Sequence, residues 1–294
     1  MKPLRTALFA PGNRPDRAEK ALGLDADAVF IDLEDAVPIS EKEKTRPLVR
    51  QVLDSNPGKR MYVRINGVKT PYWKGDLEAI VCKHLVGVVV PKVEAPEDIF
   101  TLDKALTDLE VKAGMKMGAL EVISICESAK GLEELYSIVL SKAEKHPISM
   151  VSFGAADFTL DLGIGLTREG KELDYPRSRI PIACRAAGII PPIDTPWMVD
   201  LKDMDGLIAD AKKAKAFGFQ GKIVIHPNQI QPCHDVFTPT EEEISYAKAV
   251  IEAFEEAERD GKAALQLDGK FIDYPIVEKS RRICALAQAI AEKG

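Results

Sequence analysis

The sequence lacks the cysteine pattern of a disulfide-bonded or zinc-binding protein. Its 294 residues include five cysteines, an odd number, and these lie far apart without any C-x-x-C pair. Disulfide frameworks and structural zinc sites need several cysteines at close, regular spacings. We therefore expect free thiols and a protein of the reducing cytoplasm.

Long apolar runs and an excess of positive charge are also missing. No stretch reaches the roughly 18 to 20 apolar residues of a membrane span, and the N-terminal apolar run at residues 4–10 is too short for a signal-peptide core. The formal net charge is -6, which provides no global basic surface for nucleic acid or an anionic membrane. We expect neither as a partner.

The sequence does contain eight short β-rich runs that alternate with helical segments. They cover residues 4–10, 28–31, 61–66, 85–90, 121–126, 149–153, 188–193 and 221–226. Eight parallel βα units are the number that closes a (β/α)₈ barrel. An open doubly wound sheet is the alternative, but Pro11-Gly12-Asn13 after the first run is not the G-x-G-x-x-G turn typical of that fold. We predict an α/β fold, with a TIM barrel over residues 1–230.

The remaining residues, 231–294, have a different pattern. A long polar helix is predicted over 240–260, a hairpin at Asp268-Gly269, and a last helix over 276–292. A segment of this size has little chance of burying a core by itself. We predict a C-terminal helix–hairpin–helix extension that docks on a barrel, either its own or, as we expect, that of a neighbouring subunit.

Two of the apolar runs end close to an acidic residue. Residues 121–126 are followed by Glu127, and residues 149–153 are followed by Gly-Ala-Ala-Asp157. The C-terminal ends of barrel strands form one rim, where active sites lie. Because Mg²⁺ is commonly held by one or two carboxylates, the sequence predicts a divalent-metal site at these two acids. A helix cap is the alternative role for Asp157.

Other polar residues share this position at strand ends. They are Glu34, Asp35, Arg64, Lys92, Asp194 and His226. Arg64 lies within an apolar strand, where an unpaired guanidinium is costly. We expect it to pair with Glu34 or Asp35, to meet developing negative charge on a substrate, or both.

The neighbouring charged residues have more than one interpretation. One of Asp32, Glu34 and Asp35 is expected to cap the following helix, and the others to neutralise Arg64 or Lys92. Lys92 is a Schiff-base candidate, although an ion-paired or solvated lysine is the more ordinary role.

Three further residues are weaker candidates. Arg14 and Lys20, on the first loop and helix, suit the binding of phosphates or are simply solvated charges. His226 is expected to be a hydrogen-bonded rim residue rather than a metal ligand or a base.

The order of motifs along the chain is more specific than any single residue. The motifs are Leu8-Phe-Ala-Pro-Gly12, Asp32-Leu-Glu-Asp-Ala-Val37, Val63-Arg-Ile-Asn66, Val90-Pro-Lys92, Glu127, Phe153-Gly-Ala-Ala-Asp157, Gly221-Lys222 and Ile225-His-Pro-Asn-Gln-Ile230. This order resembles the citrate lyase β-subunit-like branch of the HpcH/HpaI aldolase superfamily. The tail, with Phe271-Ile-Asp-Tyr-Pro275, is similar to the C-terminal extension of acyl-CoA lyases in that group.

The resemblance implies a Mg²⁺-dependent barrel enzyme, with Mn²⁺ as the alternative ion, that cleaves or forms a carbon–carbon bond in a 2-hydroxyacyl thioester. By position, Glu127 and Asp157 match the metal ligands and Arg64 the substrate-binding arginine. Asp273 matches an acid that is presented to an adjacent subunit's site, which implies a homo-oligomer, a trimer or hexamer. Arg14 and Lys20 fall where related lyases contact the CoA phosphates.

The expected chemistry follows from these matches. Asp273, with Glu34 in reserve, is the acid/base candidate, and Arg64 is expected to stabilise a thioester enolate. The backbone at Gly154, Ala155 and Ala156 is expected to bind the substrate carboxylate.

Several other outcomes remain open. A synthase or thioesterase would act on the same substrate class, a class I aldolase would use Lys92, and a non-catalytic CoA-ester binding protein would keep the barrel. The sequence leaves open which acyl group is cleaved and whether it is carried by free CoA or by an acyl-carrier protein.

Overall fold

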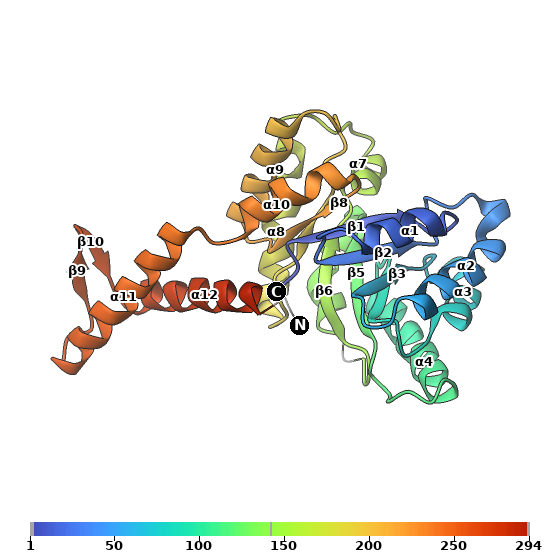
Figure 1. Ribbon diagram of the computed structural model, residues 1–294, viewed down its shortest axis with the longest axis horizontal. Coiled ribbons are helices and arrows are strands. Elements are labelled where there is room, and N and C mark those ends of the chain that lie inside the picture. Colours follow the sequence, from blue (N-terminus) through green and yellow to red (C-terminus); the bar gives the residue numbers. More distant parts are fainter. Residues whose placement is uncertain (1–2, 142, 293–294) are drawn as a thin grey trace. The chain divides into compact units, whose positions relative to one another are not determined.

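The chain folds as a closed barrel of eight parallel strands surrounded by helices, as predicted (Figure 1). The computed structural model describes residues 3–141 and 143–292. Neighbouring strands pair in sequence order, and β8 pairs with β1 to close the barrel. The strands are β1 Thr6–Pro11, β2 Ala28–Asp32, β3 Met61–Arg64, β4 Gly87–Val90, β5 Glu121–Cys126, β6 Ile148–Phe153, β7 Ile193–Asp194 and β8 Gly221–Val224.

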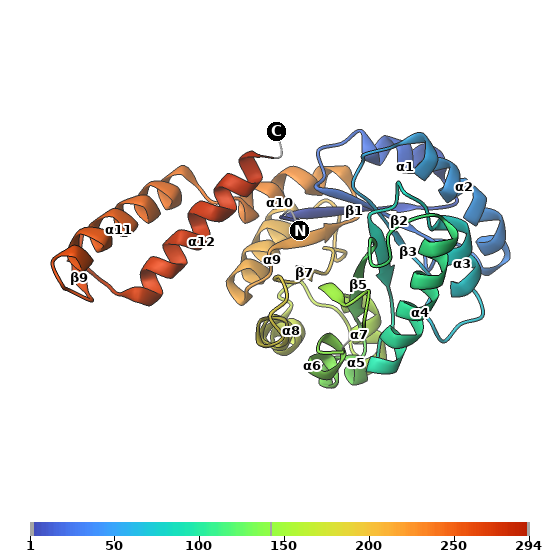
Figure 2. The same cartoon turned by 90° about the horizontal axis from the view of Figure 1, so that it is seen from below.

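Helices follow the strands and pack around the outside of the barrel, where α2, α3 and α4 lie next to one another (Figure 2). The α-helices of this part are α1 Pro15–Leu22, α2 Lys42–Ser55, α3 Trp73–Ile80, α4 Pro96–Lys112, α5 Ala129–Glu133, α6 Leu135–Val139, α7 Ala155–Leu162, α8 Asp174–Ala186, α9 Met204–Phe217 and α10 Ile230–Phe237. Three short 3-10 helices are η1 Ile39–Glu41, η2 Lys171–Leu173 and η3 Pro227–Gln229. Within the described residues, no helix is both long and apolar enough to span a membrane.

The barrel interior is filled by side chains from alternate positions of the strands. Successive side chains of a strand point to opposite faces, so residues i and i+2 share a face. The inward-facing cluster is Leu4, Ala7, Ala28, Phe30, Tyr62, Val89, Ile123, Ile125, Met150, Ile193 and Ile223. The position two residues after a member of this cluster therefore faces inward as well, which decides which strand-end residues reach the barrel mouth.

The seventh strand is the weakest, as its prolines predicted. Only Ile193 and Asp194 form β7, because Pro191 and Pro192 just before them have no N–H to donate to a neighbouring strand. Of the predicted run at residues 188–193, only the last residue is therefore part of a strand.

The chain forms two compact units, Leu4–His234 and a second that contains the segment from Asp235 onward. The second unit contains α11 Glu241–Arg259, the hairpin of β9 Leu265–Leu267 and β10 Lys270–Ile272, and α12 Tyr274–Ala291. The hairpin turns at Asp268 and Gly269, which both have positive φ, as the Asp-Gly signal predicts. Val250, Phe254, Ile272 and Val277 form a small buried cluster of this unit.

Candidate active site

Three of the charged strand-end residues face the barrel interior because of strand alternation. Asp32 lies two positions after Phe30, Arg64 two after Tyr62, and Glu127 two after Ile125, and all three preceding residues belong to the inward-facing cluster. The top layer of the interior is therefore charged, whereas the layers below it are apolar. This arrangement places two acids and a guanidinium at the mouth of the barrel.

A cavity of about 420 Å³ opens at these strand ends. Arg64 and Asp157 line it, together with Gly154, Ala155 and Ala156. Its other lining residues are Phe9, Ala10, Pro11, Asp32, Asp35, Ala36, Ile125, Phe153, Thr195, Pro196, Met198, Ile223 and Ile225. The structure thus brings Arg64, Asp157 and the predicted carboxylate-binding backbone of residues 154–156 to one cavity, whereas Glu34 and Glu127 are not in its lining.

Arg64 is fixed mainly by Asp32. Its Nε and Nη2 donate to the two carboxylate oxygens of Asp32 at 2.7 and 2.6 Å, and its Nη1 donates to Asp35 at 3.4 Å. The guanidinium also lies over the ring of Phe9, 4.8 Å from the centroid. Burial alone would lower the pKa of Arg64, but Asp32, Glu34 and Asp35 raise it above the ordinary value, so the group stays charged.

The prediction that one of Asp32, Glu34 and Asp35 caps the next helix is wrong. Asp32 instead accepts the backbone N–H groups of Glu34 and Ala36 within the turn that follows β2, each at 2.9 Å. No side chain caps η1 or α2. The turn folds back on Asp32, and this directs all three acids toward Arg64 and Lys92 rather than toward a helix.

Glu127 is buried against the backbone of the adjacent strand end. Its Oε1 accepts the N–H of Lys92 at 2.7 Å. A Cβ at position 154 would lie 2.6 Å from Oε2 of Glu127, so only glycine fits beside this carboxylate. Lys92 itself adopts a φ of 56°, a strained conformation for a residue with a side chain, which aims its N–H at Glu127.

The electrostatics of Glu127 fit a divalent cation. Burial, together with the nearby charges of Glu34 and Asp157, raises the pKa of Glu127 to about 8. Asp157 is half-buried in the first turn of α7, and its side chain does not cap that helix. In the described residues no three His, Cys, Asp or Glu side chains form a complete metal centre. Two carboxylates are a common ligand set for Mg²⁺, which leaves its other positions to water and substrate.

Lys92 is engaged in an ion pair. Its Nζ donates to Oε1 of Glu34 at 2.8 Å and lies 3.7 Å from Asp35. Burial alone would lower the pKa of Lys92, but Glu34, Asp35 and Asp157 raise it above the ordinary value. A Schiff-base lysine must be neutral to attack a carbonyl, so this environment favours the ion-paired role.

Glu34 lies between the two cations. Its Oε2 lies 3.2 Å from Nη1 of Arg64 but forms no hydrogen bond with it. Burial raises the pKa of Glu34 above its ordinary value, against the lowering effect of the Arg64 charge. The sequence prediction that Glu34 and Asp35 neutralise Arg64 and Lys92 is confirmed, with Asp32 as the strongest partner of Arg64.

The backbone N–H groups at the start of α7 are only partly available. The N–H of Gly154 donates to the carbonyl of Cys126 and that of Ala155 to Oγ1 of Thr195, each at 3.0 Å. The first-turn N–H groups of Ala156 and Asp157 have no such acceptor within the helix. Sequence reasoning missed Thr195, which is buried and lines the cavity; its position directly after Asp194 at a strand end was the available signal.

Asp194 does not reach the cavity, so its predicted place beside the other rim residues is wrong. Because Ile193 faces inward, Asp194 faces outward toward the helices. There it pairs with Arg177 of α8 at 2.9 Å and with Lys222 of β8 at 2.6 Å. Asp210 of α9 completes this buried network, 2.7 Å from Arg177 and 2.6 Å from Lys222.

A second cavity of about 400 Å³ adjoins the first, with which it shares Phe9, Ala10, Pro11 and Ile225. Lys20, one of the predicted phosphate-binding residues, lines it, and so does Arg17, which sequence reasoning did not select. Arg14 is not among its lining residues and pairs with Asp16 at the surface. His226 also lines it, and its Nδ1 accepts the N–H of Asn228 at 3.2 Å, which is the hydrogen-bonded role predicted for it.

Asp273 lies in the C-terminal unit, where it caps α12. Its Oδ1 accepts the N–H of Ile276 at 3.4 Å. This capping role was not predicted. It leaves the second carboxylate oxygen for other interactions, because the cap uses one oxygen only.

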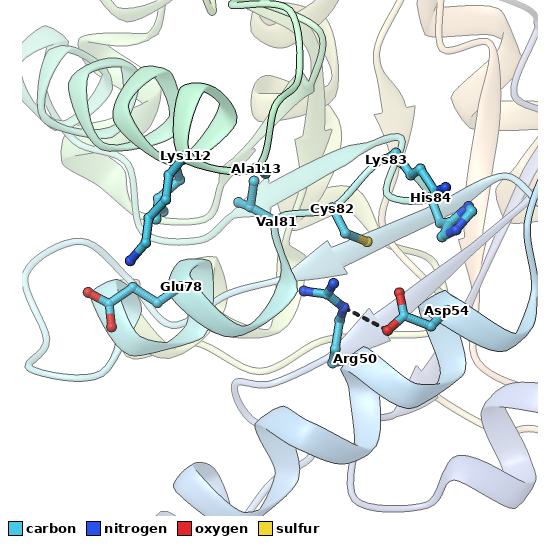
Figure 3. Close-up of a pocket in the computed structure, with 10 residues that line it drawn as sticks. Arg50, Asp54, Glu78, Val81, Cys82, Lys83, His84, Lys112 and Ala113 are labelled. Atoms are coloured by element: carbon cyan, nitrogen blue, oxygen red, sulfur yellow. Dashed lines mark hydrogen bonds and ion pairs between the residues drawn. The ribbon is translucent and has the colours of Figure 1, made fainter.

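A third hollow lies at the opposite end of the strands (Figure 3). Residues Val81, Cys82, Lys83 and His84, which precede β4, line it together with residues of α2, α3 and α4. Figure 3 shows Arg50 joined to Asp54 on the same helix and Lys112 extending toward Glu78. None of the predicted site residues lies there.

Comparisons with known proteins agree with this geometry. The family model of the HpcH/HpaI aldolase/citrate lyase family matches residues 5–227. The citrate lyase subunit beta of Leuconostoc mesenteroides is 35% identical over 97% of this chain and 93% of its own length. The mitochondrial citramalyl-CoA lyase of Rattus norvegicus is 32% identical over 99% of this chain and 88% of its own.

A solved structure with the same architecture carries ligands. The CitE protein of Mycobacterium tuberculosis, in complex with magnesium, acetoacetate and coenzyme A, has 27% identity and a TM-score of 0.78. The match covers 97% of this chain and 98% of that one.

Proposed function

Because the chain belongs to the HpcH/HpaI aldolase/citrate lyase family, we propose that it is a Mg²⁺-dependent carbon–carbon lyase acting on a 2-hydroxyacyl-CoA thioester. The products are an acyl-CoA and a 2-oxo acid. The observation that carries this proposal is the meeting of Asp157 and Arg64 in one cavity, with the buried Glu127 beside them. The adjoining cavity, with Arg17 and Lys20, is suited to the phosphates of CoA.

Glu127 and Asp157 are the proposed metal ligands. Mg²⁺ bound there supplies a Lewis acid for the hydroxyl and carboxylate oxygens of the substrate. Burial, together with the charges of Glu34 and Asp157, raises the pKa of Glu127 to about 8, and a cation bound at this place would offset both effects.

Arg64 is the proposed electrostatic catalyst. A guanidinium has five N–H donors, and Asp32 and Asp35 take three of them. Two remain for a substrate oxygen in the cavity. When the carbon–carbon bond breaks, its electron pair passes to the carbon next to the thioester, and negative charge develops on the thioester oxygen. A fixed guanidinium at that oxygen stabilises the resulting enolate.

The start of α7 and Thr195 are the proposed seat of the substrate carboxylate. The N–H groups of Ala156 and Asp157 lack intrahelical acceptors, and helix N-termini favour anions. Thr195 accepts from Ala155 through Oγ1, which leaves its hydroxyl proton to donate into the cavity. The seat thus combines backbone N–H groups with one side-chain donor.

The acid/base group is proposed to be Asp273 of a neighbouring copy, which takes the proton of the substrate hydroxyl as the bond breaks and returns a proton to the enolate carbon to give the acyl-CoA. This role requires a homo-oligomer, a trimer or hexamer, in which the C-terminal unit of one copy serves the barrel of another. Glu34 is the alternative base within the same barrel, although its bond to Lys92 occupies one oxygen.

Asp273→Asn separates the two roles of this residue, because asparagine caps a helix as well as aspartate does. We expect turnover to fall about 100- to 10,000-fold, the usual contribution of an acid/base group, while helix content and mass in solution stay unchanged. Unchanged turnover in this variant would remove Asp273 from the mechanism and favour Glu34.

A metal-supplemented panel of 2-hydroxyacyl-CoA thioesters tests the proposed function. Acyl-CoA, 2-oxo acid and free CoA are measured separately, with and without EDTA. Paired release of acyl-CoA and 2-oxo acid that EDTA abolishes is the expected result. Release of free CoA alone would indicate a thioesterase, and binding without turnover would indicate a non-catalytic protein.

The class I aldolase is the second candidate, but the ion pair of Lys92 with Glu34 disfavours it. It predicts that borohydride traps substrate on Lys92 and that EDTA has no effect. We expect no trapped adduct and full EDTA sensitivity.

A further inference from the structure

We propose that this active site selects thioesters whose hydroxyl-bearing carbon carries one carboxylate and an apolar substituent, and that it rejects those with a second carboxylate on that substituent. The inference rests on the proposed function and refines its substrate class. The two alternatives are a methyl group, as in citramalyl-CoA, and a carboxymethyl group, as in citryl-CoA. The released 2-oxo acid is then a monocarboxylic one.

The charges that line the cavity carry the first part of the argument. Among the residues the structure describes, Arg64 is the one basic side chain in the lining, against three acids, Asp32, Asp35 and Asp157. Arg64 pairs with both oxygens of Asp32, at 2.6 and 2.7 Å, and the proposed function assigns its two remaining N–H donors to the thioester oxygen. A second substrate carboxylate would therefore meet carboxylates and no cation that is free to pair with it.

The apolar side of the cavity carries the second part. Ile125 and Ile223 belong to the inward-facing cluster and line the cavity, as do the more exposed Met198 and Ile225. These side chains offer a methyl group contact without desolvating any polar group. A carboxymethyl group in the same place would lose its hydration and gain no hydrogen bond, which strongly disfavours its binding.

The basic residues outside the first cavity do not change this conclusion. Arg17 and Lys20 line the adjoining cavity, where the proposed function places the CoA phosphates. Lys92 is not in the lining of the first cavity, and its Nζ bonds to Glu34 at 2.8 Å. The positive charge of this region is thus placed for the CoA part of the substrate and not for its acyl substituent.

The direct test compares kcat/KM for citramalyl-CoA and citryl-CoA with the full-length protein and saturating Mg²⁺. We expect the methyl substrate to be preferred by about 100-fold or more, because a single methylene difference alone gives about 10- to 200-fold and an unpaired charge adds to it. Equal or better turnover of citryl-CoA would overturn this inference and leave the lyase assignment intact. Failure to cleave any thioester of the panel would instead refute the proposed function.

A substitution that supplies the missing cation provides the second test. Met198→Arg introduces a guanidinium into the lining, and Met198→Gln is the matched control with similar length and no charge. We expect only the arginine variant to gain turnover of citryl-CoA, by about 10-fold, the effect of one favourable charged pair. An equal gain in both variants, or no gain in a folded arginine variant, would contradict the charge argument.

Product inhibition gives a measurement that needs no variant. Pyruvate and oxaloacetate differ in the same way as the two substrates, by a carboxylate on the variable group. We expect pyruvate to inhibit the wild-type enzyme at concentrations about 10-fold lower than oxaloacetate. Tighter inhibition by oxaloacetate would overturn the inference even if the arginine variant failed to fold.

Discussion

Two clusters of charged residues lie in the same barrel and differ in the balance of acids and bases and in burial. The mouth cluster contains Asp32, Glu34, Asp35, Arg64, Lys92, Glu127 and Asp157, which is five acids against two bases. The outer network contains Arg177, Asp194, Asp210 and Lys222, two acids and two bases that all pair with one another. A balanced, fully paired network needs no additional ion to neutralise it, and its ion pairs connect β7, β8, α8 and α9. The unbalanced cluster is where a cation and an anionic substrate are expected.

Removing a carboxylate from the mouth cluster should have the largest effect on activity. Glu127→Gln and Asp157→Asn each should lower Mg²⁺-dependent kcat/KM by about 1,000-fold, the upper range for one preorganised electrostatic group. The thermal unfolding temperature measured without metal should not fall, because each change removes electrostatic repulsion among the acids of the mouth cluster. Steady-state kinetics over a range of Mg²⁺ and a thermal melt measure both effects. Full activity of both variants in EDTA would show that these residues hold no metal.

The same change in the outer network should affect stability instead. Asp210→Asn leaves buried cations uncompensated and should lower the free energy of unfolding by about 3 to 5 kcal/mol near neutral pH. Urea denaturation followed by circular dichroism measures this loss. Turnover per folded molecule should change little, since Asp210 does not line the active-site cavity at the strand ends. A stability equal to that of the wild type would contradict the role of this network.

The pH dependence of that loss follows from the pKa of Asp210. Burial alone would raise the pKa of Asp210, but Lys222 and Arg177 lower it to about 2, from an ordinary value of 3.8. A carboxylate whose pKa is lower in the folded state stabilises that state fully at pH values above its unfolded-state pKa. This contribution is lost as the pH falls through the folded-state pKa. The difference in unfolding free energy between wild type and Asp210→Asn should thus be constant above about pH 4 and shrink toward about pH 2. A difference that grows on acidification would contradict this.

Arg64→Lys should have the next largest effect. Lysine keeps the charge but cannot bind both oxygens of Asp32 and still donate into the cavity. We expect kcat to fall by about 100-fold, with less change in the Mg²⁺ requirement. Arg46→Lys is a matched control, because Arg46 also pairs with a buried aspartate, Asp76 at 2.9 Å, but lines no part of the cavity. Equal losses in both variants would indicate a general effect on folding.

Thr195→Val should have the smallest effect. Valine keeps the shape but removes the acceptor of the Ala155 N–H and the proposed donor to the substrate carboxylate. We expect KM to rise by about 10-fold, equivalent to about 1.4 kcal/mol, the scale of one lost hydrogen bond, and Thr195→Ser to restore most of it. Thr159→Val, a change in α7 outside the cavity lining, should leave KM unchanged. A rise in KM for the Thr159 variant alone would place the effect in the helix rather than in the carboxylate seat.

Strand alternation explains which site residues could be predicted. All eight runs were found from their apolar, β-branched composition, and Arg64, Glu127 and Asp157 were placed at one mouth because parallel strand ends meet there. Asp194 was misplaced because its position at a strand end was used without the inward or outward direction of its side chain. The sequence does not give this direction, because both faces of a barrel strand are buried, and the inward side chain of Ile193 is known only from the closed barrel.

Other features depend on residues that approach one another only in the folded chain. The sequence offered no preference for Asp32 as the bidentate partner of Arg64, and it did not reveal that Gly154 must lack a side chain because Glu127 lies against it. Thr195 was not singled out, since a threonine gains its role from the nearby N–H of Ala155.

Sequence patterns were enough to predict the number and order of the strands, the surrounding helices, the C-terminal hairpin and the acids that follow β5 and lie in the first turn of α7. These follow from local rules, because alternation, helical periodicity and turn residues act over a few neighbouring positions. Only the tertiary structure decided which charges pair fully and which remain in excess. The free energy of a charge depends on burial and on partners within a few ångströms, and those distances exist only after the barrel has closed.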